Sequence, residues 1–171
     1  MHCPDCRYDN IPGADICQKC GKPLPQVELS ASEMERSIMV HPVSVLAIKA
    51  PVSVAPTATV RSAVDAMIRN KIGCVLIVDG SALAGIFTER DVLNRVSPQP
   101  GALDRPISEF MTPSPETLRT GDSIAYALHS MTMHGLRHLP VVDANGQAVS
   151  IVSIRDVLRL LAVRFADIRS A

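Results

Sequence analysis

Apolar positions between residues 59 and 88 first follow a helical period and then change to a strand pattern. The helical stripe predicts a helix that begins after Thr59, whose hydroxyl can cap it, and that is broken by Gly73. The run from Cys74 to Val78 is apolar at every position, which is typical of a strand buried on both faces. The helical stripe has the spacing i, i+3, i+4, i+7 and i+8 and consists of Val60, Ala63, Val64, Met67 and Ile68.

Turn and strand signals on either side complete one structural unit. Residues 52–55 are predicted to be extended, and Asp79-Gly80 is a turn signal between two strands. The second of these strands is predicted from Leu83 to Phe87. Thr88 then marks the change to a closing helix that has Asp91 in its first turn. The predicted order is therefore β-α-β-β-α.

The same unit occurs twice in the chain. Residues from Pro51 to Asp79 match residues from Pro115 to Asp143 at an offset of 64. The offset then becomes 65, so that the segment from Gly85 matches the segment from Ser150. One extra residue in a turn explains the change. Two equivalent copies can pack face to face and form paired clefts, and we expect the function to lie there.

Four of the five cysteines lie in the first 20 residues. They form two C-x2-C pairs, Cys3 with Cys6 and Cys17 with Cys20, and such pairs can place four thiolates about 2.3 Å from one zinc ion. A segment of about 25 residues buries too little apolar surface to fold without a metal. We predict a structural zinc site. The two pairs and Gly21 resemble the small zinc-ribbon modules of bacterial and archaeal proteins.

Other uses of these cysteines fit the sequence less well. Disulfides are typical of exported proteins, and the N-terminus shows no apolar signal region. A redox C-x-x-C belongs at a strand–helix junction rather than at residue 3. The ribbon has balanced charge and one aromatic residue, Tyr8. This composition argues against nucleic-acid binding and favours a structural role or the docking of a protein partner.

Breaker residues divide the rest of the chain. Residues Pro23 to Pro25 predict the start of an extended linker. Further along, Ser30 and Glu33 match a capping box for a short helix. A mobile tether is the alternative. A second group of breakers at residues 97–101 separates the two repeats. The predicted domains are a zinc ribbon over 1–25, a linker over 26–42, and repeats over 43–97 and 98–171.

Composition and charge limit the class of protein. Lys plus Arg equal Asp plus Glu at 17 each, so the net field does not attract polyanions. The apolar fraction of 47% supports a core, but aromatic residues make up only 3%, so that core must be aliphatic. The longest apolar runs are about five residues, against about 20 needed to span a bilayer. A cytoplasmic protein without a membrane segment is the expectation.

Three short sequence motifs resemble those of a known family: Gly85 to Asp91, Phe110 to Thr112 and Arg137 to Asp143. Together with the duplication they resemble the CBS domain, and the two copies resemble a CBS pair, or Bateman module, over residues 40–165. The resemblance implies an α/β fold with two β-α-β-β-α repeats packed with pseudo-twofold symmetry. It also implies a homodimer formed through closing helices. The apolar residues of the last helix agree with this: Val157, Leu158, Leu160, Leu161 and Phe165.

Both repeats end in the pattern hydroxyl-x-Arg-Asp, with Thr88 before Asp91 and Ser153 before Asp156. A carboxylate can accept hydrogen bonds from the vicinal hydroxyls of a ribose, and the N–H groups at a helix start favour an adjacent phosphate. The alternative is a pair of N-caps with acids that complement the helix dipole. Repetition favours ligand binding. The resemblance implies that these positions contact the ribose and phosphate of an adenosine-containing ligand.

The resemblance also implies where the rest of each site lies. Adenine needs an apolar slot with a backbone edge. Site A, around Asp91, should borrow residues 112–117, and site B, around Asp156, should borrow residues 48–53. The further candidates are Arg90, Ile86, Ile72, Gly73, Thr112 and Thr117 for site A, and Arg155, Ile151, Leu136, Arg137, His138, Ile48 and Ser53 for site B.

Arg137 and His138 stand where the first repeat has Gly73 and Cys74, and we therefore predict that site B binds anionic nucleotides more tightly. No catalytic constellation is evident, so we do not expect an enzyme. The predicted function is a regulatory sensor of AMP, ADP, ATP, S-adenosylmethionine or a dinucleotide, with the ribbon contacting an unidentified protein. The alternative is a nucleic-acid-associated zinc-ribbon protein whose binding is modulated by nucleotide.

Overall fold

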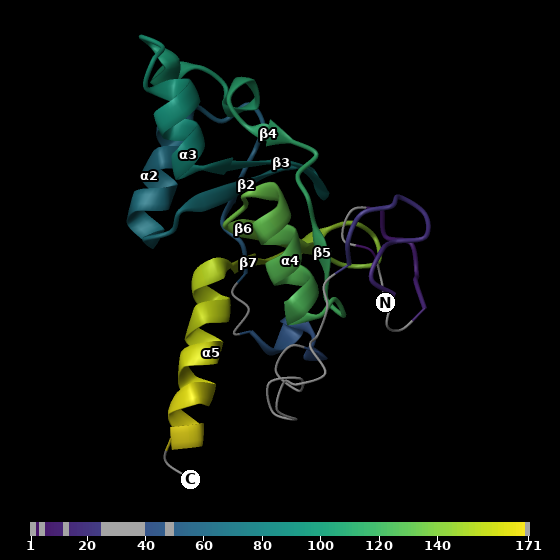
Figure 1. Ribbon diagram of the computed structural model, residues 1–171. Helices are drawn as coiled ribbons and strands as arrows, with labels where there is room; N and C mark the ends of the chain where they lie inside the picture. The colour runs from purple at the N-terminus through teal and green to yellow at the C-terminus, as the bar shows by residue number, and fades with distance from the viewer. Residues whose placement is uncertain (1–2, 4–5, 12–13, 25–39, 47–49, 170–171) are drawn as a thin grey trace. The chain divides into compact units, whose positions relative to one another are not determined.

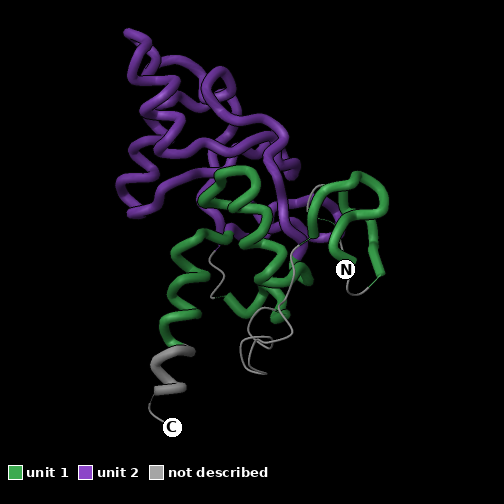
Figure 2. Tube along the Cα trace, viewed as in Figure 1, with its two compact units in different colours: residues 1–47, 120–138, 152–171 green, residues 48–119, 139–151 purple. Residues whose placement is uncertain are grey.

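The computed structural model describes residues 3, 6–11, 14–24, 40–46 and 50–169, with side chains as far as residue 163 (Figure 1). The short helix predicted after Ser30 and the candidate Ile48 lie outside the described residues. Within the described part, no helix is long and apolar enough to cross a membrane. The chain divides into two compact units (Figure 2): unit 1 is Met1–Ala47, Thr120–His138 and Val152–Ala171, and unit 2 is Ile48–Arg119 and Leu139–Ile151.

Unit 2 contains the strands and helices of the first repeat from β1 onward. Strand β1 (Ser53–Val54) lies parallel to β2 (Cys74–Asp79), which pairs antiparallel with β3 (Ala82–Thr88). Helix α2 (Val60–Asn70) connects β1 to β2. The predicted turn between β2 and β3 contains Gly80 at φ +61°, a left-handed conformation that glycine adopts without a steric cost.

Helix α2 begins where predicted but presents a different face to the core. Thr59 accepts a hydrogen bond from a first-turn N–H, which confirms it as the cap. Lys71, in the left-handed C-cap position, ends the helix before Gly73, so the prediction that Gly73 breaks it was wrong. Ile68, predicted to face inward, is 68% exposed, and Ala66 is buried instead. At about 100° per residue, the buried stripe centres between positions 63 and 67, and Ile68 falls outside it.

The closing helix of the first repeat is not a regular α-helix. Helix α3 covers only Glu89–Asp91 and continues as a π-helix, η2 (Val92–Val96). The Ser97 N–H donates to the carbonyl five residues earlier at 2.8 Å. Such π-helical turns are rare and are often found at functional sites. Two 3-10 turns, η3 (Ala102–Asp104) and η4 (Ile107–Glu109), follow in residues 97–111, the connector between the two repeats.

Strand β4 (Thr112–Pro113) adds the opening segment of the second repeat to the sheet of the first. It pairs antiparallel with β3 through Gly85 and Ile86, and the sheet order is β1-β2-β3-β4. Glycine is required at position 85, because a Cβ there would lie 2.6 Å from the Met111 sulfur and 2.9 Å from the Thr112 carbonyl oxygen. The close approach of β4 to β3 thus depends on one missing methyl group.

The second repeat has the same order of elements. Strands β5 (Leu118–Arg119), β6 (His138–Val142) and β7 (Ala148–Ser153) form a three-stranded sheet in that order, with β5 parallel to β6. Helix α4 (Ile124–His134) connects β5 to β6, and α5 (Ile154–Arg169) closes the repeat. The predicted β-α-β-β-α order is therefore confirmed for both copies, in a mixed α/β fold.

The two repeats exchange the short segments that precede them. Residues 41–43 bond to the start of α4 in the second repeat, and residues 105–107 bond to the start of α2 in the first. The two sets of contacts are related by the offset of 64 seen in the sequence. Their four hydrogen bonds, all between 2.7 and 3.0 Å, are Ile124 N–H to His41 O, Val43 N–H to Asp122 O, Val60 N–H to Arg105 O and Ile107 N–H to Ala58 O.

Strand β2 is covered on both faces, as its uninterrupted apolar sequence predicted. Val75 and Ile77 belong to a core cluster that includes the inner face of α2. Cys74 and Leu76 point to the other face and pack with Ile86 from β3. The partly buried residues Val78, Leu83, Ala148 and Ile151 pack against this second cluster.

Candidate functional site

Thr88 and Asp91 form a capping box where β3 passes into α3. The Thr88 N–H and hydroxyl donate to Asp91 Oδ2 at 2.9 and 2.7 Å, and the Asp91 N–H donates back to the Thr88 hydroxyl at 3.4 Å. Asp91 is buried, with 7% of its surface exposed. The capping role considered from the sequence is therefore real, and it holds the carboxylate in one orientation at the helix start.

The second repeat has the same arrangement where β7 passes into α5. The Ser153 N–H and hydroxyl donate to Asp156 Oδ2 at 3.0 and 2.5 Å, and the Asp156 N–H donates to the Ser153 hydroxyl at 3.4 Å. Two equivalent strand–helix junctions thus present the same hydroxyl–carboxylate pair.

The backbone before each buried strand lies against the same junction. In the first repeat the Glu89 N–H donates to the Gly73 carbonyl at 3.0 Å, and in the second the Ile154 N–H donates to the Arg137 carbonyl at 3.0 Å. In unit 2, Ile86 also pairs with Thr112 across β3 and β4. The structure therefore brings several predicted site A residues to one end of the four-stranded sheet: Gly73, Ile86, Thr88, Asp91 and Thr112.

An arginine that the sequence analysis did not select completes the first junction. Arg95, in the π-helix, places Nε 3.4 Å from Asp91 Oδ1. Its Nη1 donates to the carbonyls of Phe110 at 3.1 Å and Met111 at 2.8 Å. The spacing of Asp91 and Arg95, i and i+4, was the signal that could have revealed this ion pair.

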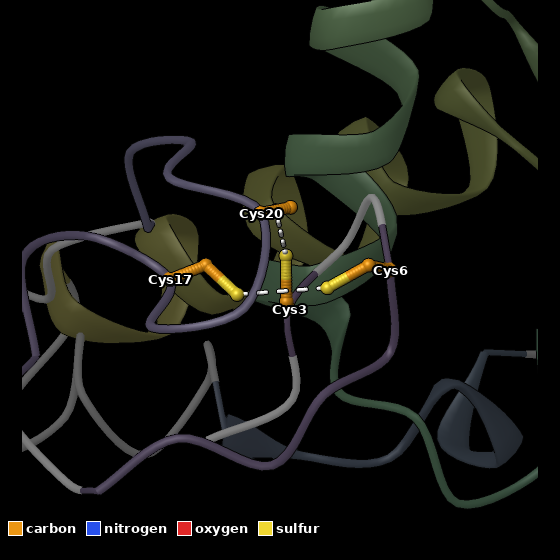
Figure 3. A group of neighbouring side chains, drawn as sticks. All are labelled: Cys3, Cys6, Cys17 and Cys20. Carbon is orange, nitrogen blue, oxygen red and sulfur yellow. Dashed lines mark hydrogen bonds between the residues drawn. The ribbon is translucent and has the colours of Figure 1, made fainter.

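The N-terminal cysteines converge on one point, as Figure 3 shows. The sulfur atoms of Cys3, Cys6, Cys17 and Cys20 all lie within 4.8 Å of one another. Cys3 and Cys20 approach to 3.5 Å, and so do Cys6 and Cys17. A tetrahedral zinc site with four thiolates has sulfur–sulfur distances of about 3.8 Å. The donor set and its spacing therefore fit the predicted zinc site.

The two cysteine pairs have the same backbone geometry. The Arg7 N–H donates to the Cys3 carbonyl and the Gly21 N–H to the Cys17 carbonyl, both at 2.9 Å. Arg7 and Gly21 have φ of +57° and +72°, so each turn closes through a left-handed residue. Each turn thereby directs two sulfur atoms to the same side.

The surroundings of Cys17 favour its thiolate form. Burial raises the pKa of the Cys17 thiol, but hydrogen bonds from the backbone N–H groups of Cys20 and Lys19 lower it, and the pKa falls to about 6. The side chain of buried Asn10 contributes a further contact to the sulfur at 3.6 Å. Metal ligation requires the deprotonated form of cysteine, so Cys17 is prepared for that role.

Comparison with known proteins identifies the two repeats. The sequence model of the family described as CBS domain matches residues 36–98 and 107–163, which is more than half of the chain. This chain belongs to the CBS domain family. The first match includes residues 41–43 and the second begins at residue 107, so each CBS repeat extends upstream of Pro51 and Pro115, where the repeats first align clearly in the sequence.

Several relatives share this CBS pair. An uncharacterized 17.7 kDa protein of Acidianus ambivalens is 33% identical over 109 residues, covering 63% of this chain and 65% of that protein. Inosine-5'-monophosphate dehydrogenase of Aquifex aeolicus is 34% identical over 113 residues, covering 64% of this chain but only 22% of the enzyme. The chain thus spans less than two thirds of both of these relatives.

A solved structure shares the same fold. The CBS domain protein of Pyrobaculum aerophilum complexed with AMP is 30% identical, with a TM-score of 0.64, and covers 71% of this chain and 98% of that chain. The similarity confirms that the two repeats form a tandem CBS pair.

For the remaining candidate residues of the CBS pair, the structure gives the exposure and the compact unit to which each belongs. Arg90 and Arg155 are exposed, and Ser53 is exposed in β1. Ile72, Thr117, Leu136 and His138 are half-buried, and Ile151 packs in the second core cluster of unit 2. Arg137, Ser153 and Asp156 belong to unit 1, whereas Ser53 and Ile151 belong to unit 2.

Proposed function

We propose that this CBS pair is a regulatory module that binds an adenosine-containing ligand at Thr88 and Asp91 and at Ser153 and Asp156. The observation that carries the proposal is the capping box repeated at two equivalent junctions. The AMP complex of the Pyrobaculum relative, which is 30% identical, supports the choice of ligand class. AMP, ADP, ATP and S-adenosylmethionine all carry the ribose that these carboxylates would hold.

The two carboxylates suit a ribose because they are oriented before the ligand arrives. A carboxylate offers about four acceptor positions, and the threonine or serine hydroxyl can turn from the carboxylate to a phosphate without any movement of a heavy atom. Hydrogen bonds to a charged group contribute about 1.5–3 kcal/mol each. We keep the prediction that Arg137 and His138 make site B the tighter site for anionic nucleotides.

Calorimetric titration with AMP, ADP, ATP and S-adenosylmethionine tests the proposal. Asp91→Asn and Asp156→Asn should each weaken one site by about 10- to 100-fold, because each removes charge-assisted hydrogen bonds. Asp104→Asn is the matched control, since Asp104 is an exposed partner of Arg61 in the connector. Unchanged affinity in both site variants, or no binding by the wild-type protein, would contradict the proposal.

We further propose that the module acts through binding rather than turnover. Relatives with whole-protein enzyme activity, such as the Aquifex dehydrogenase, match this chain over only 22% of their length. Incubation of ATP with the purified protein, followed by chromatography of the nucleotides, should show no conversion to ADP or AMP. Conversion of more ATP than the amount of protein present, lost in Asp91→Asn and Asp156→Asn, would show an enzyme instead.

The four N-terminal cysteines are proposed to hold one structural zinc ion. Zinc would tie the two cysteine turns together in a segment whose described residues form a buried apolar cluster of only Cys3, Cys17 and Leu24. Such a core is too small to fold without a metal. Elemental analysis should find one zinc per chain in the wild-type protein. Cys17→Ser should lose the zinc and Cys74→Ser, a change at the fifth cysteine, should keep it. Retention of zinc by Cys17→Ser would reject this site.

The ribbon is proposed to contact a protein rather than a nucleic acid. It exposes Tyr8, Ile11 and Ile16, and exposed apolar side chains favour protein contacts. Fluorescence anisotropy with labelled DNA and RNA should show no salt-dependent binding between 50 and 200 mM salt, whereas a phosphate-binding surface would show a steep dependence.

Self-association of the CBS pair through its last helix is also proposed. Helix α5 exposes Leu158 and Val163. Light scattering on the eluted protein should give the mass of a dimer, and Leu158→Glu should give that of a monomer. A monomeric wild-type protein would rule out this dimer.

A further inference from the structure

We propose that Arg95 is a positioning residue, which fixes the Asp91 carboxylate for a ribose and ties it to the opening segment of the second repeat. Site A would then prefer a ribose to a 2′-deoxyribose. This inference rests on the proposed nucleotide binding at Asp91.

A single guanidinium connects the two parts of site A. Arg95 Nε lies 3.4 Å from Asp91 Oδ1, while Nη1 donates to the carbonyls of Phe110 and Met111 at 3.1 and 2.8 Å. These carbonyls directly precede β4, whose Thr112 pairs with Ile86. The planar fork of arginine can make these contacts in different directions at once, which the point charge of lysine cannot do.

The acceptor positions of Asp91 determine what a ribose must displace. Three of about four positions are in use, because Thr88 supplies two donors to Oδ2 and Arg95 faces Oδ1. Two vicinal hydroxyls need two acceptor positions. The Thr88 hydroxyl can rotate away alone, whereas Arg95 is anchored by two backbone carbonyls. Arg95 therefore stays, and it holds Oδ1 in the orientation that receives the second hydroxyl.

The local backbone supports this assignment. Arg95 lies in the π-helix η2 (Val92–Val96) of the first repeat, whereas the second repeat has the regular α-helix α5 in the equivalent place. At the offset of 65, the position equivalent to Arg95 is Leu160. Asp156 instead faces Arg159 at 3.6 Å, and the Arg159 side chain is 73% exposed, against 45% for Arg95. In the first repeat the arginine beside the carboxylate is thus bonded to two backbone carbonyls, whereas Arg159 beside Asp156 is the more exposed of the two arginines.

Affinities for AMP and 2′-deoxy-AMP, measured by calorimetry on full-length protein, test the inference. Asp156→Asn is introduced first so that site A is read alone. In this background AMP should be preferred over 2′-deoxy-AMP by about tenfold or more, the value of a charge-assisted hydrogen bond. Arg95→Gln should lower the AMP affinity by about tenfold and bring the ratio close to one. Arg61→Gln, at an exposed arginine of the same unit, should leave the ratio unchanged.

Two further comparisons separate positioning from other roles. Adenosine and AMP should lose affinity by the same factor in Arg95→Gln, because the carboxylate and not the phosphate is affected; a loss confined to AMP would make Arg95 a phosphate ligand and overturn the inference. In Asp91→Asn protein, Arg95→Gln should add no further loss. Arg95→Lys, read by the same ratio, serves if Arg95→Gln does not fold, as judged by thermal unfolding.

The outcomes also distinguish this inference from the function on which it rests. If the wild-type protein binds no adenine nucleotide, the proposed function fails. If the wild-type protein binds and Arg95→Gln or Arg95→Lys keeps the full preference for AMP, only the positioning role of Arg95 is overturned.

Discussion

Gly85 and Ser150 occupy equivalent positions in the two repeats but face different surroundings. A side chain at Gly85 would collide with Met111 and with the Thr112 backbone. Ser150 is fully buried, and within the described residues its hydroxyl has no hydrogen-bond partner. The two copies have therefore diverged at the residue that decides how closely the next segment can approach.

This difference predicts that replacement by alanine has opposite effects on stability at the two positions. Gly85→Ala should lower the free energy of unfolding by about 1–3 kcal/mol, because overpacking forces the β4 backbone to move, and it should weaken nucleotide binding at site A. Ser150→Ala should leave stability unchanged or raise it by about 1 kcal/mol, because it removes an unsatisfied buried hydroxyl. Urea unfolding of both variants checks this. A stable Gly85→Ala protein would show that β4 is not held closely against β3.

Cys74 is predicted to be unreactive in the folded protein. Burial, and then the charge of Glu89, raise the pKa of its thiol to about 12 from an ordinary value of 9.0. At pH 8, iodoacetamide should modify Cys74 only after unfolding, while the four N-terminal cysteines react once a chelator is added; mass spectrometry of the peptides identifies the sites.

The same pKa has a consequence for stability. The folded protein keeps the Cys74 proton between about pH 9 and 12, whereas the unfolded chain loses it, so stability should fall as pH rises through this range. The decline should be smaller in Cys74→Ala. An equal decline in both proteins would assign the effect to other groups.

Single residues were predictable where the sequence repeats itself. Thr88, Asp91, Ser153 and Asp156 were found because the pattern occurs twice. Arg95 was missed, because the second repeat has a leucine at the equivalent position and the comparison of copies therefore carried no signal. Its contacts with carbonyls some 15 residues away along the chain depend on the path of the connector, which no local pattern specifies.

At the scale of elements, the exchanged segments should contribute strongly to stability. Ile107 and Val43 are fully buried at the starts of α2 and α4, respectively. Ile107→Ala should cost about 2–5 kcal/mol of unfolding free energy through the cavity it leaves, and Val43→Ala somewhat less. Leu103→Ala, at a more exposed position of the same connector, is the control and should cost about 0.5 kcal/mol or less. Equal effects at Ile107 and Leu103 would show that the exchange is not important for stability.

Strands and helices followed the apolar period closely, but their ends and irregularities did not. The run from Cys74 predicted β2 because every residue in it is apolar. The end of α2 was misplaced, since Lys71 rather than Gly73 adopts the left-handed turn. The π-helix was not predictable, because the period of Val92 and Val96 also fits an α-helix. The exchange could have been found by extending the repeat upstream, where Pro42 matches Pro106.

For the whole molecule, nucleotide binding should appear as increased stability. A ligand at about 100 times its dissociation constant raises the unfolding free energy by about 2.7 kcal/mol. Differential scanning fluorimetry with AMP should therefore show a higher melting temperature, and the Asp91→Asn, Asp156→Asn double variant should show little shift. An equal shift in the double variant would place the bound nucleotide outside both predicted sites.

The division of the whole molecule was less predictable than its family. The duplication and three short sequence motifs were enough to indicate a CBS pair. The two compact units, however, do not follow the repeats, since the helices α4 and α5 belong to one unit while most of the strand residues of the second repeat belong to the other. Contacts between segments far apart in sequence decide this division, and the apolar pattern reports only local partners.

The reciprocal placement of residues 41–43 and 105–107 bears on how such a gene can change. A deletion that removed one repeat would also remove the short segment that bonds to the start of the helix in the other repeat, because that segment precedes the deleted repeat in the sequence. Inheritance of the two copies as one piece is the expected result, and domain shuffling should move them together.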